Sequence, residues 1–179
     1  MAIQINGNGT ITGVSVGGLP DGIVDTDMIA ANAVTAAKKG SGSILQVQNT
    51  YTNGQVSTTS TDWATTGVTV SITPSATTSK ILLNFSNSHY NGTTNHHCYF
   101  AYFRDSTNLG SDSNGQQLIT GASGNGLWNT VSMAYLDSPN TTSSVTYSIR
   151  WKLGSQGGTS YLMYASSMNL SFTAMEVAA

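Results

Sequence analysis

Charged residues are scarce in this chain. Of its 179 residues, six are lysine or arginine and eight are aspartate or glutamate, whereas an average soluble domain is about one quarter charged. The six cations are scattered apart from the pair Lys38 and Lys39, so the chain lacks a basic stripe of the kind that neutralises phosphates. We therefore expect no nucleic-acid partner.

Cysteine and long apolar runs are also nearly absent. Cys98 stands alone, so no disulfide can form within the chain, and its apolar surroundings predict a buried, inert thiol. No run approaches the roughly 20 apolar residues of a membrane span, and the N-terminus lacks the basic and apolar regions of a signal peptide. We therefore expect no membrane span and synthesis in a cytoplasm.

Small polar residues take the place of charge. The chain has 24 serines, 25 threonines, 15 asparagines and 19 glycines, which together make close to half of it. Its 39% of hydrophobic residues is too many for a disordered chain. Abundant threonine and valine favour an all-β protein, and a polar surface with little charge suits an exposed particle surface better than a cytosolic enzyme.

The first 43 residues differ from the rest and form a first predicted domain, an anchoring arm. Residues 1–22 contain six glycines and isolated aliphatic residues, too few to bury a core. Residues 25–39 predict one short α-helix, with aspartates at its start, alanines within it and two lysines at its end. Such a short helix must dock on a partner, through a narrow apolar stripe of Met28, Ile29, Ala33 and Ala36.

From residue 44 onward the hydrophobic period changes to two, which predicts strands. Turn clusters rich in Gly, Asn, Pro and Ser separate them. The pattern predicts a jelly-roll-like antiparallel β-sandwich over residues 44–179, preceded by the extended arm and the short α-helix. The expected strands are 44–52, 67–73, 81–86, 98–103, 127–136, 145–152, 160–165 and 168–177.

One predicted strand, residues 98–103, is apolar on both faces. A single sandwich has one inner face to fill, so the second apolar face predicts a contact between copies of the chain. Closed symmetry is the usual way to bury such a face. We therefore expect a homotrimer, with the interface candidates Tyr99, Ala101 and Phe103.

Two phrases of the arm, "INGNGTITGVSVGGLPDG" and "DTDMIAANAVTAAK", resemble the N-termini of fibre and surface proteins of tailed bacteriophages, especially phages of aquatic bacteria. The following stretch, "ILQVQNTYTNGQVSTTSTDWATTGVTVSITPSATTSKILLNFS", resembles a recurrent β module of phage structural proteins, in which "SITPSATTSKILL" marks a hairpin. The resemblance covers residues 1–86.

The resemblance implies a virion structural protein: a tail fibre, a head fibre or a capsid decoration protein. It further implies a trimeric, jelly-roll-like β domain. The arm would bind other virion proteins, of the capsid or the tail, and the protein would be made in the host cytoplasm and assembled into the virion.

Metal and catalytic signals are weak. One cluster has metal-ligand chemistry: His89, His96, His97 and Cys98. Adjacent histidines in a strand face opposite sides and cannot both bind one ion, so a metal site would need His89, His97 and a third donor, or a three-fold axis that triples one histidine; we expect no metal there. The spacing of Asp21, Asp25 and Asp27 does not fit a calcium loop. No nucleophile elbow, zinc-helix motif or phosphate loop is present, so we expect neither a cofactor nor an enzyme.

Some aromatic residues could stack on sugars, namely Trp63, Trp128, Tyr90 and Tyr99. Trp128 follows a permissive Gly/Asn-rich stretch, which gives the candidate ligand contacts Trp128, Asn129 and Asn125. This favours an alternative function, a lectin-like fibre tip that recognises a host surface glycan. The competing interpretation is that Trp128 begins a strand and packs at the edge of a sheet.

Overall fold

The structure is a computed structural model that describes residues 4–5, 11–12, 29, 33–35, 38–93, 96–121, 127–163 and 169–179. The chain divides into two compact units, Met1–Lys38 and Lys39–Ala179. In the first unit, β1 (Gln4–Ile5) and β2 (Ile11–Thr12) form an antiparallel pair.

The helix expected over residues 25–39 falls mostly outside the described residues. The positions that are described there, residues 29, 33–35 and 38–39, are not in an α-helix, so the prediction is wrong at these positions. Helix-forming side chains do not hold so short a helix without tertiary packing. Of the expected anchoring stripe, Ile29 and Ala33 are exposed, while Met28 and Ala36 lie outside the described residues.

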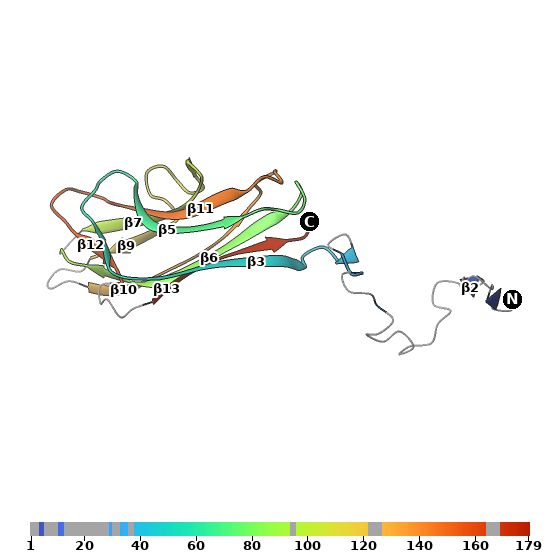
Figure 1. Ribbon diagram of the computed structural model, residues 1–179. Helices are drawn as coiled ribbons and strands as arrows, with labels where there is room; N and C mark the ends of the chain where they lie inside the picture. The colour runs from blue at the N-terminus through green and yellow to red at the C-terminus, as the bar shows by residue number, and fades with distance from the viewer. Residues whose placement is uncertain are drawn as a thin grey trace. The chain divides into compact units, whose positions relative to one another are not determined.

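The second unit consists of two antiparallel sheets packed face to face (Figure 1). The six-stranded sheet contains β3 (Ile44–Asn53), β4 (Val56–Thr58), β6 (Lys80–Asn91), β10 (Leu127–Asp137), β12 (Ser160–Leu162) and β13 (Asn169–Val177). The five-stranded sheet contains β5 (Ala64–Ile72), β7 (His97–Arg104), β8 (Thr107–Asn108), β9 (Gln117–Thr120) and β11 (Val145–Leu153). The predicted all-β, jelly-roll-like sandwich is confirmed.

Strand β6 is the centre of the six-stranded sheet. It pairs with β13 through its first half and with β12 through its last residues, and β10 pairs along nearly its whole length. Because a strand has two edges, β10 occupies one edge, and β13 and β12 share the other. The strand order is therefore β3-β13-β6-β10, with β12 and β4 continuing beyond the end of β13.

The core lies between the two sheets and follows the two-residue period. Along β6, Ile81, Leu83 and Phe85 are fully buried, while the intervening residues face outward. Phe172 of β13 meets the ring of Phe85 edge-on at 6.3 Å and stacks on Tyr102 of β7 at 5.6 Å, both between ring centroids. Each such buried ring contributes about 2 kcal/mol to the free energy of unfolding.

The chain itself covers the outer face of β7. Ala101 is fully buried and Phe103 is 5% exposed. The Arg150 guanidinium lies 4.3 Å from the centroid of the Phe103 ring, and the Trp63 ring packs edge-on against Phe103 at 5.7 Å. The backbone that follows β8 is hydrogen-bonded to β7, because the Leu109 amide donates to the Tyr102 carbonyl over 2.9 Å.

This arrangement removes the reason for expecting a trimer contact there. Ala101 and Phe103 do form a second apolar face, but other segments of the same chain bury it. Tyr99 is half-buried, with the Lys152 ammonium 5.8 Å from its ring centroid. The homotrimer itself stays a prediction.

Candidate functional site

The outer face of the six-stranded sheet differs from the rest of the sandwich in its chemistry. We call it the neutral face and define it by the outward-pointing residues of β3, β4, β6, β10, β12 and β13. Among the described residues of these strands, no Asp, Glu, Lys or Arg points outward except Lys80 at the margin, because the acidic side chains of Asp137 and Glu176 are buried on the inner side.

One end of the neutral face carries a row of aromatic side chains, which we call the aromatic row. Trp128 of β10 is directly opposite Tyr90 of β6, and Tyr90 is directly opposite Tyr161 of β12. The ring centroids are 5.1 Å apart for Tyr90 and Trp128 and 5.9 Å apart for Tyr90 and Tyr161. Trp128 is 48% exposed, and the two tyrosines are partly exposed. Three strands therefore present one continuous aromatic surface.

The middle of the neutral face is polar but uncharged. The Asn49 amide of β3 donates 2.8 Å hydrogen bonds to the hydroxyls of Ser171 and Thr173 on β13. The positions paired with them on β6 and β10 also carry hydroxyl or amide side chains. We call this set the polar belt: Asn49, Asn84, Ser86, Ser132, Ser171 and Thr173.

The other end of the neutral face carries an aliphatic row. Val47, Met175, Leu82 and Leu136 are paired in register across β3, β13, β6 and β10. Val47 is 53% exposed and Leu136 is 47% exposed. The polar belt separates this apolar row from the aromatic one.

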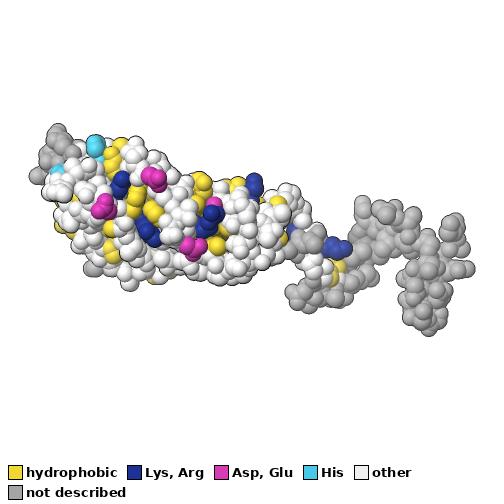
Figure 2. All heavy atoms as spheres, turned by 90° about the horizontal axis from the view of Figure 1, so that it is seen from above, with side chains coloured by type: hydrophobic (Ala, Val, Ile, Leu, Met, Phe, Trp, Pro, Cys, Tyr) yellow, Lys and Arg dark blue, Asp and Glu magenta, His cyan; other side chains and the backbone are white. Residues whose placement is uncertain are grey.

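The opposite face of the sandwich carries the charge. Figure 2 looks down on the five-stranded sheet, and Lys, Arg and Asp side chains gather there over β5, β7 and β11. The cations lie on aromatic rings, with the Lys152 ammonium 5.0 Å from the Trp63 ring centroid. The Trp63 indole N–H donates to the Asp112 carbonyl over 3.0 Å. Trp63 is thus part of this packing and is not available as a sugar platform.

The predicted ligand contacts separate into two groups. Trp128 points outward in the aromatic row, as a ligand contact requires. Asn129 is the next residue in the strand, so it points inward, opposite the buried His89. Strand alternation therefore rules out a joint Trp128–Asn129 contact. Asn125 lies outside the described residues.

Sequence reasoning named Tyr90 but not Tyr161 as a stacking candidate. The signal for Tyr161 was its position in an apolar-polar alternation directly after the glycine-rich stretch 154–159. Its pairing with Tyr90 depends on strand register between segments about 70 residues apart, which a single sequence does not reveal.

Beneath the aromatic row, the inner face of β6 carries buried polar side chains. His89 is fully buried and meets the Phe100 ring edge-on at 5.3 Å. Among the described residues, its two ring nitrogens have no hydrogen-bond partner, and the same holds for the amide nitrogens of Asn87 and Asn129. Burial lowers the pKa of His89 to about 4. His89 is therefore a neutral core residue at pH 7.

The histidine and cysteine cluster does not converge. His96 contacts the Ser155 hydroxyl, and His97 contacts the Thr120 hydroxyl on the outer surface. Cys98 points inward, and burial raises its pKa to about 12. Among the described residues, no three His, Cys, Asp or Glu side chains come together in a way that could hold a metal ion. Asp21, Asp25 and Asp27 lie outside those residues.

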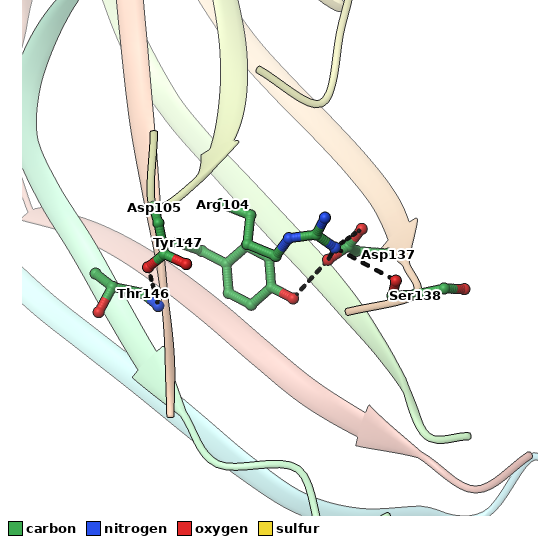
Figure 3. A network of polar contacts seen from close by, with 6 residues as sticks. All are labelled: Arg104, Asp105, Asp137, Ser138, Thr146 and Tyr147. Carbon is green, nitrogen blue, oxygen red and sulfur yellow. Dashed lines mark hydrogen bonds and ion pairs between the residues drawn. The ribbon is translucent and has the colours of Figure 1, made fainter. Parts of the chain in front are cut away.

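The two buried carboxylates of the sandwich are bound by structural hydrogen bonds. Figure 3 shows Asp137 between Arg104 and Tyr147: one Arg104 nitrogen lies 2.8 and 3.0 Å from the two carboxylate oxygens, and the Tyr147 hydroxyl donates over 2.7 Å. Burial, followed by the bond to Asp137, raises the pKa of Tyr147. This network joins β7, β10 and β11 at one end of the sandwich.

Glu176 of β13 holds the turn between β5 and β6. It accepts hydrogen bonds from the Ser75 amide at 2.7 Å, the Ser75 hydroxyl at 2.6 Å and the Gln46 amide at 2.6 Å. Burial alone would raise the pKa of Glu176, but the bonds from Ser75, Gln46 and Ser79 outweigh it and lower the pKa. Glu176 is therefore ionised and structural.

No protein-family model and no curated protein matches the chain. Among solved structures, it is similar to that of the infectious bursal disease virus Gt strain, with 15% identity and a TM-score of 0.31 over 78% of this chain and 39% of that chain. It is also similar to the infectious bursal disease virus VP2 subviral particle, with 16% identity and a TM-score of 0.32 over 75% and 38%. The chain thus spans less than half of the length of either matched chain. Similarity at TM-scores this low supports no inference about function.

The described residues contain no helix with the length and apolarity that a membrane crossing requires.

Proposed function

We propose that the protein is a structural surface protein of a tailed-bacteriophage virion: a tail fibre, a head fibre or a capsid decoration protein. Its N-terminal arm binds other virion proteins, of the capsid or the tail, and its β-sandwich projects from the particle. It is made in the host cytoplasm and reaches the virion by assembly. The sequence resemblance of residues 1–86 supports this proposal.

The structural observation behind it is that the second unit contains a hydrophobic core of its own. Every described residue of the hydrophobic core belongs to the second unit. The second unit also pairs its own two ends, since the Gly42 amide donates to the Ala178 carbonyl and the Ala178 amide donates to the Ser43 carbonyl, each over 2.9 Å. The second unit is thus a β-sandwich domain with its own core, as expected of a domain that projects from a particle.

Deleting residues 1–38 tests the anchoring role. The truncated chain should keep a cooperative thermal transition, because the described core is intact, but it should be absent from purified particles. Two point variants sharpen the test. Ile29→Asp and Val34→Asp place a charge at arm residues that are 45% and 56% exposed, and each should reduce incorporation because the arm would dock through its apolar side chains. Normal incorporation of the truncated chain would refute the proposal.

We also propose that the copies form a homotrimer through the aliphatic row. Val47, Leu82, Leu136 and Met175 supply apolar surface that the described chain leaves exposed or partly exposed, unlike Ala101 and Phe103. A closed ring of copies would bury this row about the symmetry axis.

A non-enzymatic role agrees with the state of the two buried carboxylates. Asp137 and Glu176 are both buried in structural hydrogen-bond networks, and neither is oriented toward a surface where a substrate could bind. We therefore propose that the protein acts through assembly and binding.

A further inference from the structure

The aromatic row has the geometry of a platform for sugar rings. The nonpolar C–H face of a pyranose packs on an aromatic ring, and the size of an indole makes tryptophan a large contact surface. Here three rings from three strands follow one another at 5.1 and 5.9 Å between centroids. Adjacent rings are inclined by 47° and 40°, so the row presents a twisted surface and not a flat one.

Gly92 lies at the edges of the two tyrosine rings. It follows β6 directly, and a Cβ atom placed on it would lie 3.0 Å from Cε2 of Tyr161 and 3.6 Å from Cε1 of Tyr90. A side chain at this position would therefore crowd both rings and disturb their arrangement in the aromatic row.

The chemistry around the row selects the class of ligand. Single-stranded nucleic acid also stacks on aromatic residues, but it needs a positively charged groove for its backbone, and no Lys or Arg points outward on the described strands of this face apart from Lys80 at the aliphatic end. An acidic glycan would lack a cationic partner for the same reason. The polar belt offers hydroxyls and amides, which match the hydroxyls of an uncharged sugar.

We propose that the neutral face binds a neutral oligosaccharide or polysaccharide, whose sugar rings stack on Trp128, Tyr90 and Tyr161 and whose hydroxyls hydrogen-bond to the polar belt. The site extends over β3, β6, β10, β12 and β13 and uses Trp128 without Asn129. It does not depend on the arm or on the location of the protein in a particle, so it can hold even if the proposed structural role fails.

A second copy of the chain is the main competing occupant of this surface. A stable contact between copies buries a continuous apolar patch with a polar rim. The aromatic row is instead bordered by the polar belt, which separates it from the aliphatic row. Three side chains are also far fewer than the roughly 20–30 residues a side of a standard protein interface.

The test uses the purified full-length chain. Its binding is measured by titration calorimetry against hexasaccharides of glucose, mannose and galactose and against the O-antigen polysaccharides of a bacterial panel, with heparin and polysialic acid as acidic probes. We expect at least one neutral probe to bind and both acidic probes to fail. Binding of the acidic probes alone, or of no probe, would overturn the proposal.

Point variants then locate the site. Trp128→Ala and Trp128→Leu should each weaken binding at least about tenfold, because a central tryptophan commonly contributes more than 1.4 kcal/mol of binding free energy. Leu keeps the apolar bulk, so it separates the loss of stacking from a loss of folding. Trp128→Phe should restore part of the affinity. Leu118→Ala is the matched control, because Leu118 is a 47% exposed apolar residue, close to the 48% of Trp128, but lies on β9 in the other sheet.

Two further results would decide against the site. If Leu118→Ala weakened binding as much as Trp128→Leu, the aromatic row would have no special role. If Trp128→Leu left binding unchanged but converted an oligomer to a monomer in light scattering, the row would be a contact between copies. Gly92→Ala, which crowds the tyrosine rings without removing them, should weaken binding as well, whereas Gly40→Ala, whose Cβ meets no atom within 4 Å, should not.

Discussion

The imidazole of His89 meets the Phe100 ring edge-on across the sandwich, with 5.3 Å between the ring centroids. A titratable ring is thereby placed in a fully buried position between two sheets. Burial lowers its pKa to about 4, so His89 stays uncharged in the folded protein at pH values where an unfolded chain, with a histidine pKa near 6.5, already binds a proton.

This difference makes stability depend on pH. Between about pH 6.5 and pH 4 the unfolded chain binds more protons at this position, so the free energy of unfolding falls as the pH falls. The full contribution of His89 is about 3 kcal/mol, lost by about pH 4. Urea titrations of wild type and His89→Phe at pH 7 and pH 4.5 measure it. The wild type should lose more stability than the variant; equal losses would contradict the lowered pKa.

Removing Asp137 should destabilise the sandwich strongly. Asp137→Ala leaves the buried Tyr147 hydroxyl and the Arg104 guanidinium without their acceptor, which costs about 3–5 kcal/mol for a buried pair broken on one side. Tyr147→Phe removes only the hydroxyl and should cost about 1–3 kcal/mol. The control is Asp112→Ala, since only the backbone carbonyl of Asp112 accepts the bonds from Trp63 and Lys152. If chemical denaturation showed that Asp112→Ala lowers the free energy of unfolding as much as Asp137→Ala does, this account would be refuted.

Glu176 should stabilise the protein in its ionised form. Because its pKa is lowered in the folded state, its contribution is present above the ordinary glutamate pKa and is lost as the pH falls through the folded value. Glu176→Gln keeps the size but not the charge that binds Ser75 and Gln46. It should lower the melting temperature at pH 7 and reduce the difference between pH 7 and pH 3. An unchanged melting temperature at pH 7 would contradict a structural role.

Oligomerisation should depend on the aliphatic row. Leu136→Asp introduces a charge at the proposed contact, and light scattering should report monomers where the wild type gives trimers. Leu118→Asp is a matched control, because Leu118 has the same 47% exposure but lies on β9 in the other sheet. A monomeric wild type, or equal effects of the two variants, would overturn the trimer and its proposed contact.

The sequence predicted the long strands because they alternate between core and solvent. It missed the short strands β4, β8 and β9, whose two to four residues are too few to show a period. The sequence pattern also predicted a strand that begins at Gly67, whereas β5 begins at Ala64. Gly67 has a φ of +79° at a register irregularity opposite Ile149. A glycine in that conformation resembles a turn in sequence but is an interruption within the strand.

The candidate site was predicted in part for a similar reason. Trp128 could be predicted from its local sequence context. Its neighbours depend on strand register: Tyr90 lies beside Trp128, Tyr161 lies beside Tyr90, and Asn129 points inward. The error at Phe103 has the same origin. An apolar residue on the outer side of a strand predicts that something covers it, but not what covers it. In the fold, Trp63 and Arg150 cover Phe103, and they lie 40 and 47 residues from it in the sequence.

The separation of charge between the two faces of the sandwich has a consequence in water of different salinity. Dissolved ions screen exposed charges at distances beyond about 8 Å at physiological ionic strength and at shorter distances in stronger salt. The neutral face has no ion pair to be screened, so its apolar and hydrogen-bonding contacts would keep their strength from fresh water to brine. The face that carries Lys152, Arg150 and the exposed aspartates would respond most to a change of salinity.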